Sequence, residues 1–157
     1  VSALDVAIRA QILNLLAQLQ RELGLTYLFI SHDMAVVEHL CDEIAVMYLG
    51  QIVERAPRNV FFAQPLHPYS AALMSAVPTV HGGRTRAAHR IKLAGDPPSP
   101  INPPAGCRFA GRCPAAEPAC VAEAQPLREV VPGHWVRCRR VQVHDAQAQP
   151  VLSLQSA

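Results

Sequence analysis

The first part of the chain, up to residue 56, carries regular patterns of apolar and polar positions. Between residues 8 and 23 apolar side chains recur at steps of three and four, which predicts an amphipathic helix with one apolar stripe. Ser2 or Asp5 can cap the start of this helix, and Gly24 is a natural stop. The stripe consists of Ile8, Ile12, Leu15, Leu16, Leu19 and Leu23.

The next segments alternate between strand and helix patterns. The short apolar run 25–31 is rich in aromatic and β-branched residues, which predicts a buried strand. Residues 33–40 form a second helix in this interpretation, 43–49 a strand, Gly50 a turn and 51–54 a return strand. Helix, buried strand, helix and strand in this order predict an α/β sheet.

The texture changes at Pro57, because all 14 prolines lie at or after this position. One or two helical turns are expected over 59–63, and a helix over 69–76 with Pro68 in its first turn. Residues 79–94 are expected to form a linker, and the proline-rich stretch 95–106 to be extended. Beyond Val141 the chain lacks any period and is expected to be a disordered tail.

Composition narrows the possible classes of protein. With 157 residues, half of them apolar, and a formal net charge of +2, the chain fits a globular protein and not a strongly basic nucleic-acid binder. Its apolar runs are shorter than the roughly 18–20 residues of a membrane span, and no signal peptide is recognised. It begins at Val1 and not at Met, which indicates a piece of a longer protein.

The chain has a single lysine, Lys92, in the context Arg90-Ile91-Lys92-Leu93. A phosphate-binding loop needs a glycine-rich turn that ends in Lys-Ser or Lys-Thr, so a complete P-loop is excluded within these residues.

One order of motifs points to a family. Ser2-Ala3-Leu4-Asp5, a helix, the apolar run and then Ser31-His32-Asp33 resemble the distal half of an ABC-transporter ATPase domain, and the resemblance continues through residues 42–47 and 50–54. The resemblance implies the distal part of a P-loop α/β ATPase fold over residues 1–64. It makes Ser2, Ala3, Leu4 and Asp5 the D-loop at the dimer interface. It makes His32 the switch histidine, which donates a hydrogen bond to the γ-phosphate.

The family's phosphate loop, glutamine loop, signature motif and Walker B carboxylates all precede the D-loop and are missing from this chain. The resemblance implies ATP and Mg²⁺ as ligands of the full-length subunit. Because phosphoryl transfer needs the lysine, the Mg²⁺ ligands and the general base, this chain alone is predicted to have no ATPase activity.

Residues 65–140 resemble the C-terminal extension of the oligopeptide/dipeptide branch of these ATPases, which serves peptide or nickel importers. The extension is expected to be small, irregular and cysteine-rich. The resemblance rests on Leu66-His67-Pro68-Tyr69, on the proline-rich stretch 95–104, and on the cysteine segment that begins at Cys107. It implies a peripheral protein on the cytoplasmic face of the bacterial inner membrane. The implied partners are a second ATPase subunit in a homo- or heterodimer, two transmembrane permease subunits and, indirectly, an extracytoplasmic peptide-binding protein.

Four of the five cysteines cluster in the sequence, at Cys107, Cys113, Cys120 and Cys138. Disulfides are not expected in a cytosolic chain. Four thiolates suit zinc, although the usual closely spaced pair is missing, or an iron–sulfur cluster, whose spacings vary more. The flanking arginines are expected to favour thiolate over thiol, and they are Arg108, Arg112, Arg137 and Arg139.

Spacing alone does not separate iron from zinc, and the resemblance to the peptide-transporter branch favours a [4Fe–4S] cluster. His134 is a possible substitute ligand, and four reduced, unligated cysteines are the simplest alternative. A stand-alone iron–sulfur or zinc module without ATPase activity is the competing hypothesis for the whole chain, and a remnant without activity is a third.

Overall fold

The computed structural model describes residues 6–77, 79–81, 84–86, 90–145 and 147–152. These residues divide into two compact units, 1–42 and 43–157. The division lies earlier than the domain boundary expected near residue 64, and the predicted domain ranges stay predictions. Among the described residues, no helix is long and apolar enough to cross a membrane.

The first unit contains two helices, α1 (Val6–Leu23) and α2 (Met34–Leu40). Both were expected. Gly24 ends α1 with a φ of 63°, a left-handed conformation that glycine adopts without steric cost. Asp33 caps α2, since its carboxylate accepts a hydrogen bond from the N–H of Ala35 at 3.1 Å.

The strand expected over 25–31 is wrong for this chain. The segment has no regular secondary structure, and its aliphatic side chains are exposed, Leu28 to 93% and Ile30 to 90%, while Tyr27 and Phe29 are half-buried. A strand is stable only when its backbone N–H and C=O groups pair with a neighbour, and no described segment pairs with this one. The apolar run therefore has the composition of a buried strand but lacks the sheet that would bury it.

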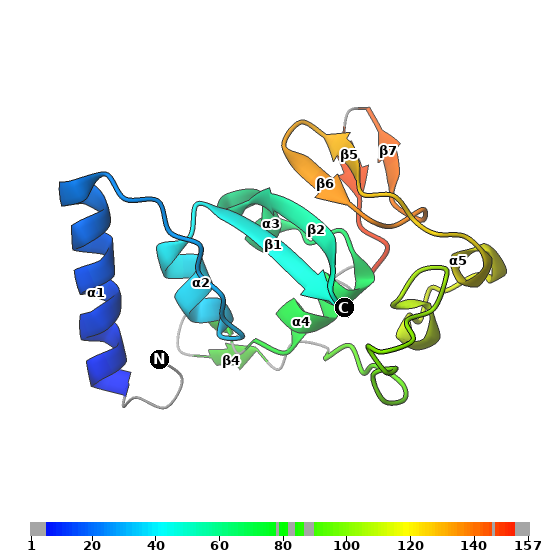
Figure 1. The fold of residues 1–157 in the computed structure, drawn as a ribbon, viewed down its shortest axis with the longest axis horizontal. Helices are drawn as coiled ribbons and strands as arrows, with labels where there is room; N and C mark the ends of the chain where they lie inside the picture. Colours follow the sequence, from blue (N-terminus) through cyan, green and yellow to red (C-terminus); the bar gives the residue numbers. More distant parts are fainter. Residues whose placement is uncertain (1–5, 78, 82–83, 87–89, 146, 153–157) are drawn as a thin grey trace. The chain divides into compact units, whose positions relative to one another are not determined.

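The second unit is built on a four-stranded sheet with the order β1-β2-β6-β5 (Figure 1). Its strands are β1 (Glu43–Tyr48), β2 (Gln51–Pro57), β5 (Arg128–Val131) and β6 (His134–Val136). All neighbouring pairs run antiparallel, and the finer prediction, the distal part of a P-loop ATPase domain, stays a prediction. Mixed helix and sheet content, by contrast, is confirmed.

Two strands of this sheet come from the cysteine-bearing extension, for which an irregular structure was expected. Glu54 pairs with Val136 and Arg55 with Trp135, so that β6 extends the β1–β2 hairpin by one strand and β5 by another. The pairing joins segments about eighty positions apart, which no local pattern encodes. The extension is thus part of the same sheet as the hairpin.

Short helices and hairpins complete this unit. The helices are α3 (Arg58–Ala63), α4 (Pro68–Ser75), the single 3₁₀ turn η1 (Ala110–Arg112) and α5 (Pro118–Ala122). The remaining strands are β3 (Thr79–His81), β4 (Arg84–Arg86), β7 (Gln142–His144) and β8 (Gln147–Gln149), which form two separate hairpins. The stretch 95–106 is without helix or strand, as predicted.

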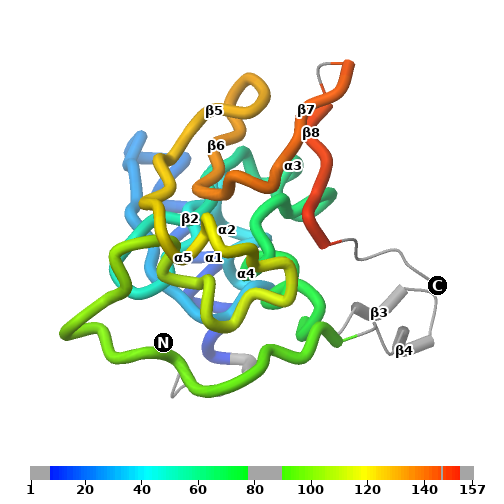
Figure 2. Tube along the Cα trace, turned by 90° about the vertical axis from the view of Figure 1, so that its right-hand side faces the viewer, coloured from blue at the N-terminus to red at the C-terminus, as the bar shows by residue number. Residues whose placement is uncertain are grey.

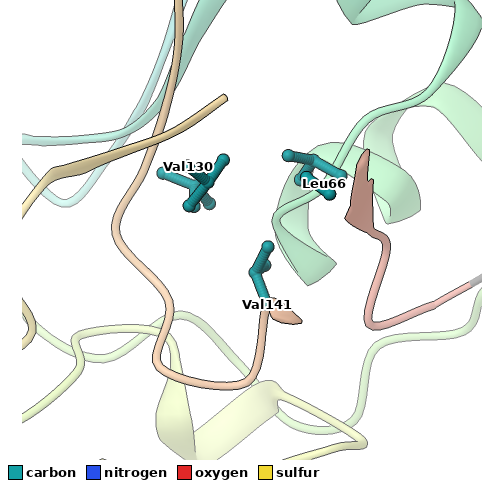
Figure 3. Close-up of a cluster of buried hydrophobic side chains, with 5 residues drawn as sticks. Leu66, Val130 and Val141 are labelled. Carbon is teal, nitrogen blue, oxygen red and sulfur yellow. The ribbon is translucent and has the colours of Figure 1, made fainter. Parts of the chain in front are cut away.

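The β7–β8 hairpin stands where a disordered tail was expected, beside the β5–β6 hairpin (Figures 1 and 2). Its Ala148 belongs to a buried apolar cluster with Leu66, Val130, Val136 and Val141, and Figure 3 shows three of these side chains facing one another. Burial of this apolar surface explains why a segment with a polar, aperiodic sequence is ordered.

Candidate functional site

The predicted switch histidine lies in a short turn between the exposed run 25–31 and α2. His32 itself is exposed. Its neighbours fix the turn, because the Asp33 N–H donates to Ser31 Oγ at 3.0 Å and Arg9 Nη1 donates to Asp33 Oδ2 at 2.9 Å. The second bond is an ion pair that joins α1 to the cap of α2. The imidazole is thus exposed to solvent on a turn whose flanking residues, Ser31 and Asp33, are fixed by hydrogen bonds.

The predicted D-loop residues Ser2, Ala3, Leu4 and Asp5 lie outside the described residues. Their proximity to His32 stays a prediction. The segment that follows them is described, and its first turn carries Arg9, the residue that holds Asp33.

The most completely satisfied polar group of the second unit is the carboxylate of Glu54, in β2. It is fully buried and accepts hydrogen bonds from the N–H groups of Leu66 and His67, both at 2.8 Å. The buried ring of His134, in β6, lies with Nε2 2.8 Å from Glu54 Oε1 and serves as a third donor. One side chain therefore joins β2, the loop before α4 and β6. His134 therefore binds Glu54 and does not act as a substitute ligand with the cysteines.

The His67-Pro68-Tyr69 triplet begins α4. His67 caps the helix, since its Nδ1 accepts a hydrogen bond from the N–H of Tyr69 at 3.1 Å, and Pro68 occupies the first turn. Burial lowers the pKa of His67 to about 4, against the opposing effect of the Glu54 carboxylate. His67 is thus a neutral capping residue in a packed interior, and the triplet has a structural role at the start of α4.

The four clustered cysteines lie in the second unit as free thiols, with Cys120 buried and the other three half-buried. Cys107 and Cys113 flank η1, Cys120 lies in α5, and Cys138 follows β6. The Cys107 N–H donates to the Cys120 carbonyl at 2.7 Å, which brings these two segments into direct contact.

The thiols are near enough to affect one another electrostatically. Burial raises the pKa of Cys113 to about 11, and the neighbouring thiols of Cys138, Cys107 and Cys120 add to the rise. Burial likewise raises the pKa of Cys107 and Cys138. Among the described residues, however, no three His, Cys, Asp or Glu side chains are arranged closely enough to hold a metal ion. The three segments that carry the four cysteines converge, but their side chains are not in ligand geometry.

The expectation that flanking arginines favour thiolates is wrong, because burial outweighs them and their guanidinium groups bind other partners. Arg108 donates to the carbonyl of Leu49, and Arg112 to that of Ala94. Arg137 donates to the carbonyls of Ile52 and Gln125, and Arg139 pairs with two glutamates. Of the four flanking arginines, only Arg137 lowers the pKa of Cys107, and its effect is the smallest of the causes.

Glu54 was missed as a key residue at the level of sequence, although a signal was present. In a regular strand, side chains two positions apart share a face, so the sequence pattern places Glu54 between the apolar Ile52 and Ala56. In the structure a bulge at Val53 leaves only Ala56 on the buried face of Glu54. An acidic residue between apolar neighbours on one face predicts a buried carboxylate that needs donors. Which donors it would find could not be predicted, since His134 is distant in the sequence.

Comparisons with known proteins match both units of the chain. Residues 53–120 match the family described as the oligopeptide/dipeptide transporter C-terminal region. A putative peptide import ATP-binding protein of Brucella ovis is 55% identical over 141 residues, which are 89% of this chain and 44% of the relative. The oligopeptide transport ATP-binding protein AppF of Bacillus subtilis is 49% identical over 138 residues, 88% of this chain and 42% of the relative.

A probable peptide ABC transporter ATP-binding protein of Sinorhizobium fredii is 53% identical over 138 residues, 88% of this chain and 38% of the relative. The chain therefore spans less than half the length of the curated relatives that it matches. The resemblance inferred from the motifs is confirmed.

Proposed function

We propose that the chain belongs to the oligopeptide/dipeptide transporter ATP-binding proteins and is the distal part of the ATP-binding subunit of a bacterial peptide importer. The single observation that carries this proposal is identity of about half the positions over 88–89% of the chain, across both compact units. A stand-alone metal module explains only the cysteine segment. The proposal accounts for the switch-loop motif and the extension together.

In this proposal His32 binds the γ-phosphate of ATP in the full-length subunit. Its exposed imidazole can donate a hydrogen bond to a phosphate oxygen, where negative charge must be stabilised during transfer. Asp33 and Arg9 act one step away, because their ion pair fixes the turn that presents the ring. Ser2, Ala3, Leu4 and Asp5 form the D-loop that faces the second ATPase subunit.

The exposed run 25–31 becomes a strand of the ATPase sheet in the full-length subunit. Two nearly fully exposed aliphatic side chains, Leu28 and Ile30, are what a strand presents when its sheet partners are missing. The strand would end at Ser31, which places His32 at a carboxyl end, the position where sheets of this class bind ligands. These exposed side chains support the finer fold that we propose, the distal part of a P-loop ATPase domain.

The full-length subunit would use ATP and Mg²⁺ and couple hydrolysis to uptake of di- or oligopeptides. It would lie on the cytoplasmic face of the inner membrane, against two permease subunits and a second ATPase subunit, with an extracytoplasmic peptide-binding protein as an indirect partner. These assignments come from the names and the family of the relatives.

The experiment compares ATP hydrolysis by this chain and by the full-length subunit. The chain is expected to show none above background. In the full-length subunit His32→Ala is expected to lower kcat by about a hundredfold, the typical cost of removing one donor to a developing negative charge. The matched control is His39→Ala, an exposed histidine in the last turn of α2. Equal loss in the two variants, or turnover by the chain alone, would contradict the proposal.

We further propose that the four clustered thiols hold a [4Fe–4S] cluster, with zinc as the alternative metal. The residues fit such a cluster in two ways. Thiolates are its usual ligands, and Cys107, Cys113, Cys120 and Cys138 approach one another from three segments, with the backbone of Cys107 bound to that of Cys120. They fit only after side-chain rearrangement, because no three are in ligand geometry. Bound metal would supply bonds that cross-link these segments.

The metal proposal is tested by anaerobic purification with absorbance, iron and zinc analysis. A brown protein whose iron is lost in Cys120→Ser would support iron–sulfur binding, while Cys41→Ser, outside the group, should keep its iron. A colourless protein with stoichiometric zinc would assign zinc in place of iron. Absence of both metals from the protein would leave four unligated thiols and contradict the proposal.

A further inference from the structure

Two residues beside the cysteine site point away from it. Phe109, two positions after Cys107, is only 1% exposed. Its ring centroid lies 5.2 Å from that of Tyr48, edge to face, and 5.4 Å from that of Tyr69. Tyr48 is the last residue of β1, so the cysteine loop places an aromatic anchor against the end of the β1–β2 hairpin.

Arg108 contacts the turn of the same hairpin. Its Nη1 donates a hydrogen bond to the carbonyl of Leu49, and a Cβ atom added at Gly50 would lie 3.5 Å from that nitrogen. The turn has an uncommon backbone, with φ of 45° at Leu49 and 75° at Gly50. Positive φ is disfavoured for a leucine, so this conformation persists only when surrounding contacts hold it.

The loop that carries these two residues is fixed at its other side by α5. Besides the bond from Cys107 to Cys120, Gly106 approaches the backbone of α5 so closely that an added Cβ would meet the Val121 carbonyl oxygen at 2.2 Å. Any side chain at Gly106 must therefore displace the loop from α5. The positions of Arg108 and Phe109 depend on this approach.

We propose that the cysteine loop, residues 106–113, is a lock on the β1–β2 turn, with Arg108 and Phe109 as its positioning residues. When the cysteine segments are held together, the guanidinium and the ring are seated and the turn keeps its strained conformation. When the loop is displaced, both contacts are lost and the turn is released. The part of the inference that makes metal the holder of the loop rests on the proposed cysteine site.

The connection has consequences beyond the turn. The hairpin also carries Glu54, which binds the loop before α4 and β6. The state of the cysteines is thereby joined, through the β1–β2 turn, to the hairpin that carries this buried carboxylate.

Hydrogen exchange of the amides of residues 48–52, read by mass spectrometry together with metal content, tests the lock in the 157-residue chain. Phe109→Ala and Arg108→Gln should speed this exchange about tenfold while metal content is unchanged, since local protection reports local opening. Gly106→Ala should speed it whether or not metal is present. Cys120→Ser, or Cys113→Ser if the former fails to fold, should lose metal and speed exchange together.

The matched control is Arg140→Gln. It removes the same charge near the cysteines, but the Arg140 side chain pairs with Glu117 and not with the hairpin. In this variant the amides of residues 48–52 should exchange at the wild-type rate. Unchanged exchange in Phe109→Ala and Gly106→Ala would overturn the lock, even if the protein binds iron. A metal-free wild-type protein whose turn is released by both variants would instead overturn the metal site and keep the lock.

Discussion

The two compact units differ in how far their apolar side chains are buried. In residues 1–42 the expected apolar stripe of α1 is partly exposed, with Leu15 at 53% and Leu23 at 64%, and the run 25–31 exposes its aliphatic side chains. In residues 43–157 Phe61 and Phe109 are almost completely buried, although Met47 and Ile101 are exposed.

The difference teaches where the contacts of each unit come from. The second unit closes its own sheet with β5 and β6 and satisfies its buried carboxylate internally. In the described part of the first unit, Asp33 caps α2 and pairs with Arg9, while Leu28 and Ile30 of the apolar run stay exposed. Local signals are sufficient to form helices, whereas a buried strand needs neighbours that a fragment of a sheet does not supply.

The largest loss of stability is expected when Glu54, which connects β2, β6 and the loop before α4, is replaced. Glu54→Ala removes the acceptor of two buried N–H groups and of His134, and should destabilise the unit by about 3–5 kcal/mol, the range for breaking a buried pair. Urea unfolding measures the loss. Glu43→Ala, which removes an exposed carboxylate from the same hairpin, is the control and should leave the midpoint nearly unchanged. Similar midpoints for the two variants would refute the role of Glu54.

Acid should weaken the second unit through His67. Its folded pKa of about 4 lies below the 6.5 of an ordinary histidine, so the unfolded chain takes up the proton first. Stability should therefore fall as the pH drops from about 6.5 to about 4, by about 3 kcal/mol, and this contribution should be constant below that range. His67→Asn keeps a capping residue and should abolish the slope. A slope that persists in this variant would assign the acid effect to another group.

A smaller, local effect is expected in the first unit. Arg9→Gln breaks the ion pair to Asp33, whose side chains are 25% and 35% exposed, so the cost should be at most about 1 kcal/mol. Faster hydrogen exchange at the start of α2 would show it. Arg21→Gln removes the same charge from the last turn of α1 and should not change that exchange. A loss spread over the whole chain would contradict a local role for Arg9.

The smallest effect sharpens the contrast between the units. Leu28→Ser and Ile30→Ser change side chains that bury almost nothing, so the free energy of unfolding of this chain should change by less than about 0.5 kcal/mol. Leu66→Ala, in the buried cluster of the second unit, should cost about 2–5 kcal/mol in the same assay. Comparable losses at Leu28 and Leu66 would show that the run 25–31 is packed in solution.

Features written in local sequence were predictable. The stop at Gly24, the cap at Asp33, the turn at Gly50 and the start of α4 at Pro68 each depend on a few adjacent residues, and the structure has all four. The apolar run 25–31 has the composition of a buried strand, but the prediction that it forms one in this chain was wrong. A strand is buried only when neighbouring segments pack against it.

Features that join distant segments were not predictable. The pairing of β2 with β6, the hairpin in the expected tail and the contact of His134 with Glu54 depend on which segments meet, and a pairing register has no local signature in a single sequence. The four-cysteine site expected from the number and spacing of the thiols stays a prediction, since no three of the described side chains are in ligand geometry. The contacts of Arg108 and Phe109 with the end of β1 and its turn were not predicted.

The most direct test of the central claim is hydrogen exchange of the amides of residues 25–31, measured in this chain and in the full-length subunit. If the chain is the distal part of an ATPase domain, these amides should exchange at nearly unprotected rates in the chain and be protected at least about a hundredfold in the full-length subunit, where sheet partners pair with them. Unprotected amides in both proteins would contradict the claim, as would strong protection in the chain alone.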